Sequence, residues 1–425
     1  MSKATGLKCV SCGAEYPVSR MFEGCPRCRD GEFAANLTVQ YDYTDLNGLT
    51  RQEFGSWKGE GLWRFAPLLP IEAEECRISL LEGDTPLVLC RGVSEKTGVQ
   101  VFAKDESRGP TWSYKDRLAC VATAKALEFG AKVTTVASTG NHGAATAAYA
   151  ARAGLDCVVF TLPTASEAML SLMQAYGAKL VATTFYGRWD LMSHCVKNFG
   201  WYPLGNYVHA LPTGNPFGVE GYKTIAYEIC LQRDWEVPDI IVSPVAYGEG
   251  FYGIWKGFRE LKQLGLIDRT PTMIAVEPSG GPLSNAVRNN LPAPVRVPSK
   301  KSVAFSINGD MIGMQALVAI RESGGTTVEV PDAEIMAAQA MFGREGLYVE
   351  PSSAASLAAV WKMARAGGLS GAKSIVCIIT SSGLKDPGAT AAVNPKPPVV
   401  EPQVDEMFRA LKDVYGFEVA SRITY

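Results

Sequence analysis

From about residue 95 to residue 380 the chain alternates between short apolar runs and longer amphipathic stretches. The apolar runs predict strands at 101–103, 133–136, 157–160, 240–242, 273–276 and 374–379. Two stretches between them, 116–129 and 141–153, have helical periodicity and end at Gly130 and Gly154. Short apolar strands separated by helices are typical of parallel sheets that helices cover on both faces. The pattern therefore predicts the α/β class.

Three polar loops directly follow predicted strands. They are Ser138 to Gly143, Gly248 to Gly253 and Thr380 to Gly383. In parallel sheets, ligands bind beyond the carboxyl ends of the strands, so these loops are candidate sites. The first two loops also precede helices, where free backbone N–H groups favour a carboxylate or a phosphate.

The second loop, Gly248 to Gly253, has the G-x-G-x-x-G spacing of a dinucleotide-binding fingerprint. A strand precedes it, a helix follows it, and Glu277 ends the next strand, where a ribose-binding acid is expected. This pattern supports one alternative, an NAD-dependent oxidoreductase. That alternative leaves Lys115, at the start of the helix predicted over 116–129, without a function.

Four cysteines near the N-terminus form two C-x-x-C pairs, Cys9 with Cys12 and Cys25 with Cys28. Two such turns complete a tetrahedral site of four thiolates, so we expect a structural zinc ion in a knuckle over residues 1–35. The four thiolates leave no open coordination position for catalysis. Nucleic-acid binding by this segment is disfavoured because it has no basic cluster.

Composition narrows the class of protein further. The chain has 425 residues, enough for two or three domains, and 47% of them are apolar. A net charge of −2 gives no basic field for nucleic acid. No segment reaches the ~18 apolar residues of a membrane span, and the first residues lack the apolar core of a signal peptide. We therefore expect a cytoplasmic protein without membrane partners.

Several short motifs follow one another along the chain. They are Glu82-Gly83-Asp84-Thr85-Pro86-Leu87, Lys104-Asp105-Glu106, Pro110-Thr111-Trp112-Ser113-Tyr114-Lys115-Asp116-Arg117, Ser138 to Gly143, Glu345-Gly346, Glu350-Pro351-Ser352-Ser353-Ala354-Ala355-Ser356 and Thr380-Ser381-Ser382-Gly383-Leu384-Lys385-Asp386-Pro387. Together they resemble the fold-type II pyridoxal-phosphate-dependent enzymes, and the last three resemble the threonine synthase branch. Some threonine synthase-like members also have a zinc knuckle. The likeness covers residues 80–390 and implies a two-domain fold like that of the tryptophan synthase β subunit.

The resemblance also implies roles for individual residues. Lys115 would form a Schiff base with pyridoxal 5'-phosphate, and its freed amine would later move the α-proton of an amino-acid substrate. The other cofactor-binding residues would be Asn141 at the ring hydroxyl, Ala246, Tyr247, Gly248, Glu249 and Gly250 at the phosphate, and Thr380 at the ring nitrogen. The substrate-binding residues would be Ser138, Thr139 and Thr213.

The implied activity is that of a lyase of the threonine synthase family, most economically conversion of O-phosphohomoserine and water to threonine and phosphate. Gly218 stands where the family has an arginine, so a bidentate phosphate clamp is missing, and Glu249 brings a carboxylate to the cofactor-phosphate loop. Arg117, Lys223 or Arg344 could supply the missing anion site. The alternative activity is that of a β-eliminating dehydratase or ammonia-lyase, or a β-replacement synthase, acting on a serine-like substrate.

The same reasoning divides the chain into segments. We expect the knuckle to be followed by a large cofactor-binding domain made of 36–118 and 236–393, with a small mobile domain over 119–235 inserted in it. The rest, 394–425, forms a C-terminal extension that begins as a proline-rich linker and continues as a helix over 404–414. By the resemblance, the enzyme would be a homodimer.

Overall fold

A computed structural model of the protein describes residues 2–208, 212–298 and 300–418. The chain forms two compact units, residues 1–385 and residues 386–425. The first unit contains three sheets, and all the loops singled out above belong to it.

The largest sheet has six strands. In spatial order they are β12 (Thr326–Val330), β11 (Thr272–Pro278), β10 (Ile240–Pro244), β13 (Ser374–Ile379), β5 (Gln100–Asp105) and β4 (Leu87–Leu89). All neighbours are parallel apart from β5 and β4. The strands predicted at 101–103, 240–242, 273–276 and 374–379 are confirmed, and with them the α/β class.

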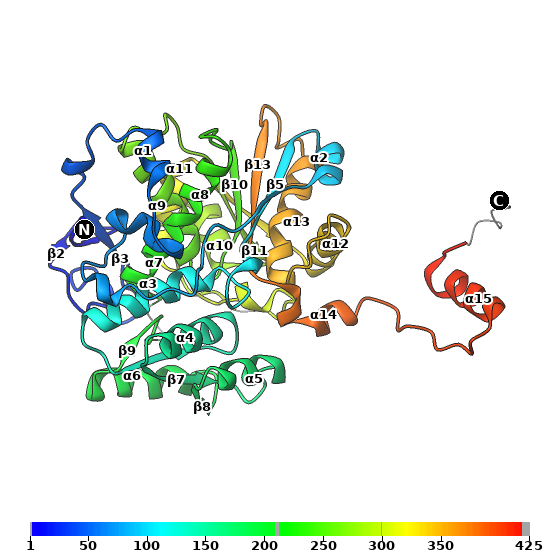
Figure 1. Ribbon diagram of the computed structural model, residues 1–425, viewed down its shortest axis with the longest axis horizontal. Helices are drawn as coiled ribbons and strands as arrows, with labels where there is room; N and C mark the ends of the chain where they lie inside the picture. Colours follow the sequence, from blue (N-terminus) through cyan, green and yellow to red (C-terminus); the bar gives the residue numbers. More distant parts are fainter. Residues whose placement is uncertain (1, 209–211, 299, 419–425) are drawn as a thin grey trace. The chain divides into compact units, whose positions relative to one another are not determined.

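Helices cover both faces of this sheet (Figure 1). One face carries α8 (Lys223–Gln232), α9 (Glu249–Gln263) and α11 (Met314–Ser323). The other carries α2 (Arg91–Thr97), α12 (Asp332–Arg344) and α13 (Pro351–Arg365). Successive strand residues point to opposite faces. Ile241 accordingly belongs to the core that includes α8 and α9, whereas Val242 belongs to the core that includes α13.

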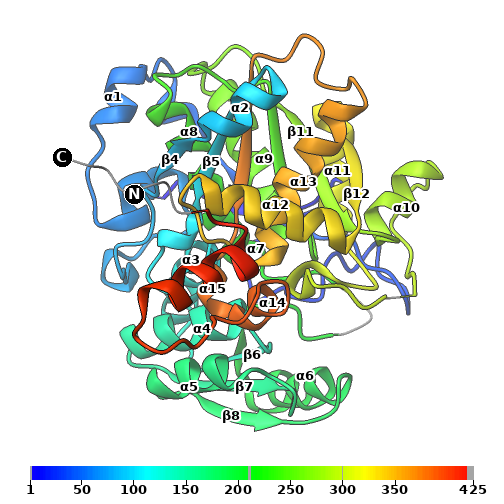
Figure 2. The same ribbon diagram turned by 90° about the vertical axis from the view of Figure 1, so that its right-hand side faces the viewer.

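A second, four-stranded parallel sheet holds the other predicted strands. Its spatial order is β8 (Lys179–Ala182), β7 (Asp156–Thr161), β6 (Val133–Ala137) and β9 (Tyr202–Pro203). Its helices are α4 (Asn141–Arg152), α5 (Glu167–Ala175) and α6 (Gly187–Phe199). Figures 1 and 2 show these elements together at the lower end of the molecule. The predicted helix over 116–129 is α3 (Lys115–Glu128), which packs against α4.

The N-terminal segment forms a small antiparallel sheet of β2 (Glu15–Tyr16), β1 (Ala4–Cys9) and β3 (Leu37–Tyr41). It is tied to the chain that follows β9. The Nδ2 of Asn36 donates to the carbonyl oxygen of Thr213 at 3.0 Å, and the Thr213 hydroxyl donates to that of Phe22 at 2.6 Å. Tyr207 donates its hydroxyl to Glu23 at 2.8 Å.

The remaining elements are short. The other α-helices of the first unit are α1 (Arg51–Ser56), α7 (Pro216–Val219) and α10 (Pro282–Arg288). Its 3-10 helices are Thr44–Leu46, Gly61–Leu68, Glu74–Cys76, Glu106–Arg108, Glu220–Tyr222, Phe305–Ile307 and Gly383–Lys385. The second unit contains α14 (Pro387–Ala391) and α15 (Val404–Tyr415), which confirms the helix predicted over 404–414. Within the described ranges, no helix is both long and apolar enough to cross a membrane.

Candidate active site

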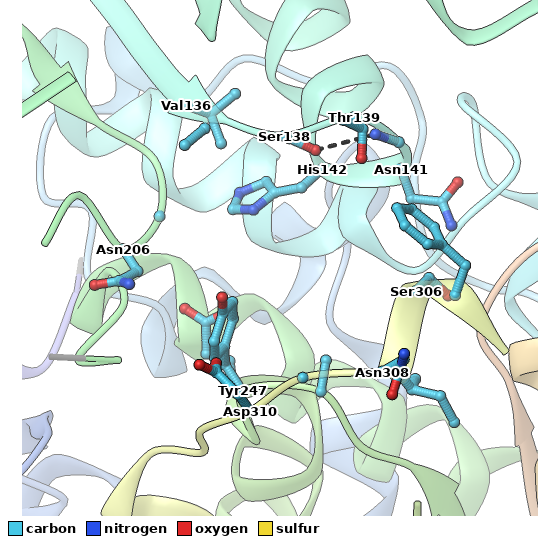
Figure 3. A pocket seen from close by; sticks show the side chains of 18 of the residues that line it. Val136, Ser138, Thr139, Asn141, His142, Asn206, Tyr247, Ser306, Asn308 and Asp310 are labelled. Atoms are coloured by element: carbon cyan, nitrogen blue, oxygen red, sulfur yellow. Dashed lines mark hydrogen bonds between the residues drawn. The ribbon is translucent and has the colours of Figure 1, made fainter. Parts of the chain in front are cut away.

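A cavity of about 800 Å³ lies where loops from the six-stranded and the four-stranded sheet meet (Figure 3). Each of the three predicted loops contributes to its wall, together with the starts of α3 and α6 and the segments 296–298 and 305–310. The predicted site residues that line it are Lys115, Ser138, Thr139, Asn141, Ala246, Tyr247, Glu249 and Thr380. The fold therefore brings these loops to one place, as expected for the carboxyl ends of parallel strands.

Lys115 is the first residue of α3 and its side chain is half-buried in this cavity. Its Nζ lies 5.3 Å from the ring centroid of Tyr114 and 5.9 Å from that of Tyr222. No hydrogen bond or ion pair engages the amine among the described residues. Burial lowers the pKa of Lys115, against the opposing charges of Glu249 and Glu350. A lysine with a lowered pKa is more often the neutral amine, which is the nucleophilic form.

The loop between β10 and α9 forms a cradle of backbone groups. Gly248 is the N-cap of α9, with φ of 90°, and the first turn has no side-chain cap. Uncapped N–H groups at a helix start attract an anion such as a phosphate. Gly250 allows close packing, since a Cβ there would lie 2.6 Å from the ring of Tyr114. Gly248 and Gly250 shape this loop although their own atoms do not line the cavity.

Glu249 does not turn away from the site. Its side chain lines the cavity with 6% of its surface exposed, and it lies against Gly214. Its Oε1 is buried and finds no hydrogen-bond partner within residues 2–208, 212–298 and 300–418. Burial raises the pKa of Glu249, while the charge of Lys115 and the backbone N–H of Asn215 oppose that shift. A protonated Glu249 carries no charge against a phosphate and can donate a hydrogen bond to it.

At another part of the wall, Asn141 is held by Glu350. Its Nδ2 donates to Glu350 Oε2 at 3.1 Å, and the Ser306 hydroxyl donates to Oε1 at 2.9 Å. Burial raises the pKa of Glu350, and these two hydrogen bonds oppose the shift. The hydroxyls of Thr380 and Ser353 lie 2.9 Å apart. Glu350 and Ser353, at the start of α13, thus fix the two residues predicted to contact the cofactor ring.

The loop after β6 is ordered by its own serine. The Ser138 oxygen accepts backbone hydrogen bonds from Gly140 at 3.2 Å and Gly143 at 3.0 Å. This arrangement holds Ser138, Thr139 and Asn141 on one side of the cavity, opposite Tyr247 in Figure 3. The backbone groups at the start of α4 and these hydroxyls can bind a substrate carboxylate.

Other expectations about anion binding differ from the structure. Arg117 is buried in ion pairs with Glu106 and Glu228, Lys223 is buried beside Glu220 and Glu260, and Arg344 is exposed on α12. None of the three cations lines the cavity, so the suggestion that they replace the missing arginine is wrong. The residues that line it without having been predicted include Arg188, Asn206, Arg296, Ser306, Asp310 and Glu350.

Thr213 does not line the cavity, and its hydroxyl donates to the carbonyl oxygen of Phe22 in the N-terminal segment. Its predicted contact with the substrate stays a prediction. Nothing in the local sequence around Arg188 or Asn206 indicated a site, because they come from the start of α6 and the chain after β9 rather than from a loop with a recognisable motif.

The four N-terminal cysteines form a cluster. Their sulfur atoms lie within 4.8 Å of one another, with Cys9 and Cys28 at 3.7 Å and Cys12 and Cys25 at 3.7 Å. Four sulfurs about 2.3 Å from a tetrahedral zinc ion are separated by about 3.8 Å. The N–H groups of Ser11 and Cys12 point to Cys9 Sγ, as suits a thiolate. The donor set therefore fits a metal ion.

Comparison with known proteins is consistent with this site. A family model described as "Pyridoxal-phosphate dependent enzyme" matches residues 78–381. Threonine synthase of Methanocaldococcus jannaschii is 36% identical over 414 residues, which is 96% of this chain and 99% of the relative. That of Methanosarcina acetivorans is 38% identical over 414 residues, 95% of this chain and 98% of the relative.

Solved structures show the same fold. Maize serine racemase has a TM-score of 0.63 and 19% sequence identity, and the match covers 72% of this chain and 91% of that one. Threonine deaminase isoform 2 of Solanum lycopersicum has a TM-score of 0.63 and 20% identity, covering 73% and 88%. At these identities the likeness concerns the fold alone.

The dinucleotide alternative is not supported. The loop Gly248 to Gly253 lies within residues 78–381, which match the pyridoxal-phosphate dependent enzyme family. Glu277, the expected ribose-binding acid, accepts hydrogen bonds from the N–H groups of Leu283 at 3.0 Å and Ser284 at 2.7 Å. Its carboxylate is therefore occupied by the first turn of α10, and it does not line the cavity.

Proposed function

Because this chain belongs to the pyridoxal-phosphate dependent enzymes, we propose that Lys115 carries the cofactor and that the enzyme converts O-phosphohomoserine and water to threonine and phosphate. The enzyme is a threonine synthase-like lyase. The observation that supports the role of Lys115 is its half-buried amine, with a lowered pKa and no polar partner among the described residues, in a cavity that the three loops enclose.

The residues around Lys115 suit each part of pyridoxal 5'-phosphate. The N–H groups from Ala246 to Gly250, at the start of α9, would hold its phosphate, Asn141 would donate to its ring hydroxyl, and Thr380 would lie at its ring nitrogen. When bound, the cofactor withdraws electrons from the α-carbon of an amino acid and permits elimination or replacement along the side chain. A hydroxyl such as that of Thr380, unlike an aspartate, leaves the ring nitrogen largely unprotonated.

The other steps belong to side chains of this protein. Ser138 and Thr139, with the start of α4, bind the substrate carboxylate and so present the α-carbon to Lys115. The amine of Lys115 takes the α-proton and returns a proton later in the cycle, which its lowered pKa favours.

A second candidate activity is elimination or replacement at the β-carbon of a serine-like amino acid. It is favoured by Gly218, since that position cannot hold the arginine that the threonine synthase pattern requires. Rates with O-phosphohomoserine, serine, threonine, O-phosphoserine and 2,3-diaminopropionate separate the two activities. Threonine formed from O-phosphohomoserine alone supports the first, and turnover of serine-like substrates alone supports the second.

We also propose that the cluster of Cys9, Cys12, Cys25 and Cys28 holds a structural zinc ion. The sulfur separations support this, as does the donor set, since four cysteine thiolates suit the tetrahedral coordination of structural zinc. We propose three further properties on the basis of the family. The chain divides into a large domain of 36–118 and 236–393 and a small mobile domain over 119–235. The enzyme is cytoplasmic, and it is a homodimer.

The first test of the proposed function is the absorption spectrum of the purified protein. We expect a near-ultraviolet or violet band that borohydride removes, and its loss in Lys115→Ala. Lys132→Ala, a change of an exposed lysine, serves as the control and should keep the band. A protein that pyridoxal 5'-phosphate cannot colour would contradict the proposal.

A further inference from the structure

A buried arginine lies in the cavity wall. Arg188, in the first turn of α6, has 5% of its surface exposed. Its Nε donates to the Phe185 carbonyl oxygen at 3.1 Å, and its guanidinium carbon lies 4.5 Å from the ring centroid of Trp189. Within the described ranges, no carboxylate pairs with it. Burial lowers the pKa of Arg188, and only the Tyr247 phenol opposes that shift.

This environment is unusual because a buried charge is costly without a partner. Arg117, which is also buried, has two carboxylates, Glu106 and Glu228. Arg188 instead faces a cavity large enough for a ligand. An anionic ligand would supply the missing partner, and a guanidinium forms paired hydrogen bonds with a phosphate or a carboxylate.

Asn206 gives a second, independent indication of a ligand. Its Oδ1 and Nδ2 are both buried and have no hydrogen-bond partner in the part of the chain that the structure describes, although the residue lines the same cavity. Figure 3 shows its side chain at the edge of the cavity, on the side of Tyr247 and away from Asn308. A buried amide with both groups unsatisfied favours a polar ligand, to which the Nδ2 can donate.

The carboxylates of the cavity do not replace that ligand. Asp310 pairs with Arg296, and Glu350 accepts hydrogen bonds from Asn141 and Ser306. The first turn of α9 carries Glu249, whose pKa is raised by burial. The positive charge of Arg188 is therefore left for a molecule that enters the cavity.

Gly218 lies in a tight contact between α7 and α3. This residue of α7 packs against α3, and a Cβ built on it would lie 2.9 Å from Leu118 Cγ and 3.1 Å from Ala122 Cβ. The position has no room for an arginine side chain, and it does not line the cavity. A clamp for an anionic substrate must come from another element.

We propose that Arg188, assisted by Asn206, binds the anionic group at the end of the substrate's side chain. This inference rests on the proposed function and narrows it to substrates that carry a phosphate or a similar anion, against neutral serine-like amino acids. Arg188 could also bind the phosphate of the cofactor, which has the same chemistry. The test distinguishes the substrate's anionic group from the cofactor's phosphate.

The test compares Arg188→Gln and Arg188→Lys with Lys197→Gln, which removes an exposed positive charge from the same helix. Holoenzyme is titrated with 2-amino-5-phosphonopentanoate and with norvaline, its neutral counterpart, and binding is followed by the change in the cofactor's absorption. We expect Arg188→Gln to weaken phosphonate binding on the order of 10- to 100-fold, Arg188→Lys to weaken it less, and norvaline binding to stay unchanged. Lys197→Gln should behave as the wild type.

Three results would overturn the inference. They are an unchanged affinity for the phosphonate in Arg188→Gln, an equal loss for phosphonate and norvaline, and a loss of affinity for pyridoxal 5'-phosphate alone, which would assign Arg188 to the cofactor. If the wild type binds no cofactor, the proposed function fails, and calorimetry with inorganic phosphate tests the anion site by itself. Phosphate binding that Arg188→Gln abolishes supports the site, and equal binding by both proteins refutes it.

Discussion

Glu249 places a carboxyl group beside the backbone groups that we propose to bind the cofactor's phosphate. Burial raises the pKa of this carboxyl above its ordinary value, against the opposing effects of Lys115 and Asn215. The protonated carboxyl is uncharged and can donate a hydrogen bond to a neighbouring phosphate, whereas the ionised carboxylate repels it. Glu249 therefore links cofactor affinity to pH at the scale of one residue.

We expect Glu249→Gln to bind pyridoxal 5'-phosphate on the order of tenfold more tightly than the wild type once Glu249 is ionised. In the wild type, ionisation of Glu249 at rising pH should weaken binding of pyridoxal 5'-phosphate. Glu249→Gln removes this part of the pH dependence because glutamine does not ionise. Fluorescence titration at a series of pH values, from acidic to alkaline, measures both affinities. Glu95→Gln, which removes an exposed carboxylate of α2 away from the cavity wall, should keep the wild-type trend. Parallel pH profiles for wild type and Glu249→Gln would refute the linkage.

Gly250 offers a steric test of the same cradle. A Cβ at this position would meet the Tyr114 ring at 2.6 Å, so Gly250→Ala must displace Tyr114, the neighbour of Lys115. Overpacking of this kind costs about 1–3 kcal/mol, and we expect cofactor affinity to fall at least about tenfold. Gly343→Ala is the matched control and should bind as the wild type. A Cβ added to this helical glycine of α12 would have no atom within 4 Å beyond its chain neighbours and the backbone of its own helix. Equal affinities in the two variants would show that the cradle tolerates a side chain.

At the scale of elements, the strands differ in how well the sequence predicts them. β10 and β13 are buried on both faces, so their residues form continuous apolar runs that are readily recognised. β4 and β12 lie at the edges of the sheet and are partly exposed. The sequence of β12, TTVEV, carries no such run, and β4 is apolar but only three residues long, too short to be distinguished by its pattern. Neither edge strand was predicted, although both belong to the same sheet.

The site divides in the same way. Lys115, Asn141 and Thr380 follow strands or begin helices, and the positions of parallel strands alone bring such loops together. Arg188 and Asn206 reach the cavity through the packing of α6 and the chain after β9. Burial and missing partners identify these two residues, and neither property can be derived from local sequence.

The N-terminal sheet is expected to stabilise the chain after β9. Phe22, Glu23 and Asn36 of its loops form hydrogen bonds with Tyr207 and Thr213. Both of these partners are close in sequence to Asn206. If the cysteines hold zinc, losing the metal should loosen these contacts, because small metal-bound ribbons depend on the ion for folding. Lys115, which we propose to carry the cofactor, begins α3 and lies outside this sheet.

We therefore expect Cys25→Ser, or treatment with a strong chelator, to lower the thermal midpoint and weaken substrate binding while the cofactor band remains. Zinc content by mass spectrometry and the Michaelis constant measure the two effects. Cys195→Ser, a change of a partly buried cysteine outside the cluster, is the control and should retain zinc. One zinc per chain in Cys25→Ser, or none in the wild type, would contradict the metal assignment.

At the scale of the whole molecule, a buried ionic network joins α3, which begins at Lys115, to α8 and to β5 of the large sheet. Glu228 on α8 pairs with Lys104 on β5 at 2.7 Å and with Arg117 on α3 at 2.7 Å. Arg117 also pairs with Glu106 at 2.6 Å. Although burial alone would raise the pKa of Glu228, the charges of Arg117 and Lys104 hold it well below the ordinary value. The network thus fixes the helix that begins at Lys115 against the large sheet.

A lowered pKa means that the ionised form of Glu228 stabilises the folded state. This contribution is complete above the unfolded-state pKa of about 4.3 and is lost as the pH falls toward the folded-state pKa. Glu228→Gln leaves two buried cations without their shared partner, so we expect it to lower the free energy of unfolding by about 3–5 kcal/mol at neutral pH. Urea unfolding at neutral pH and below about pH 4 should show a difference from the wild type that narrows in acid. Glu236→Gln, an exposed glutamate that pairs with Arg233, is the control and should leave the midpoint unchanged. A difference that is equally large in acid would mean that Glu228 acts through packing rather than through its charge.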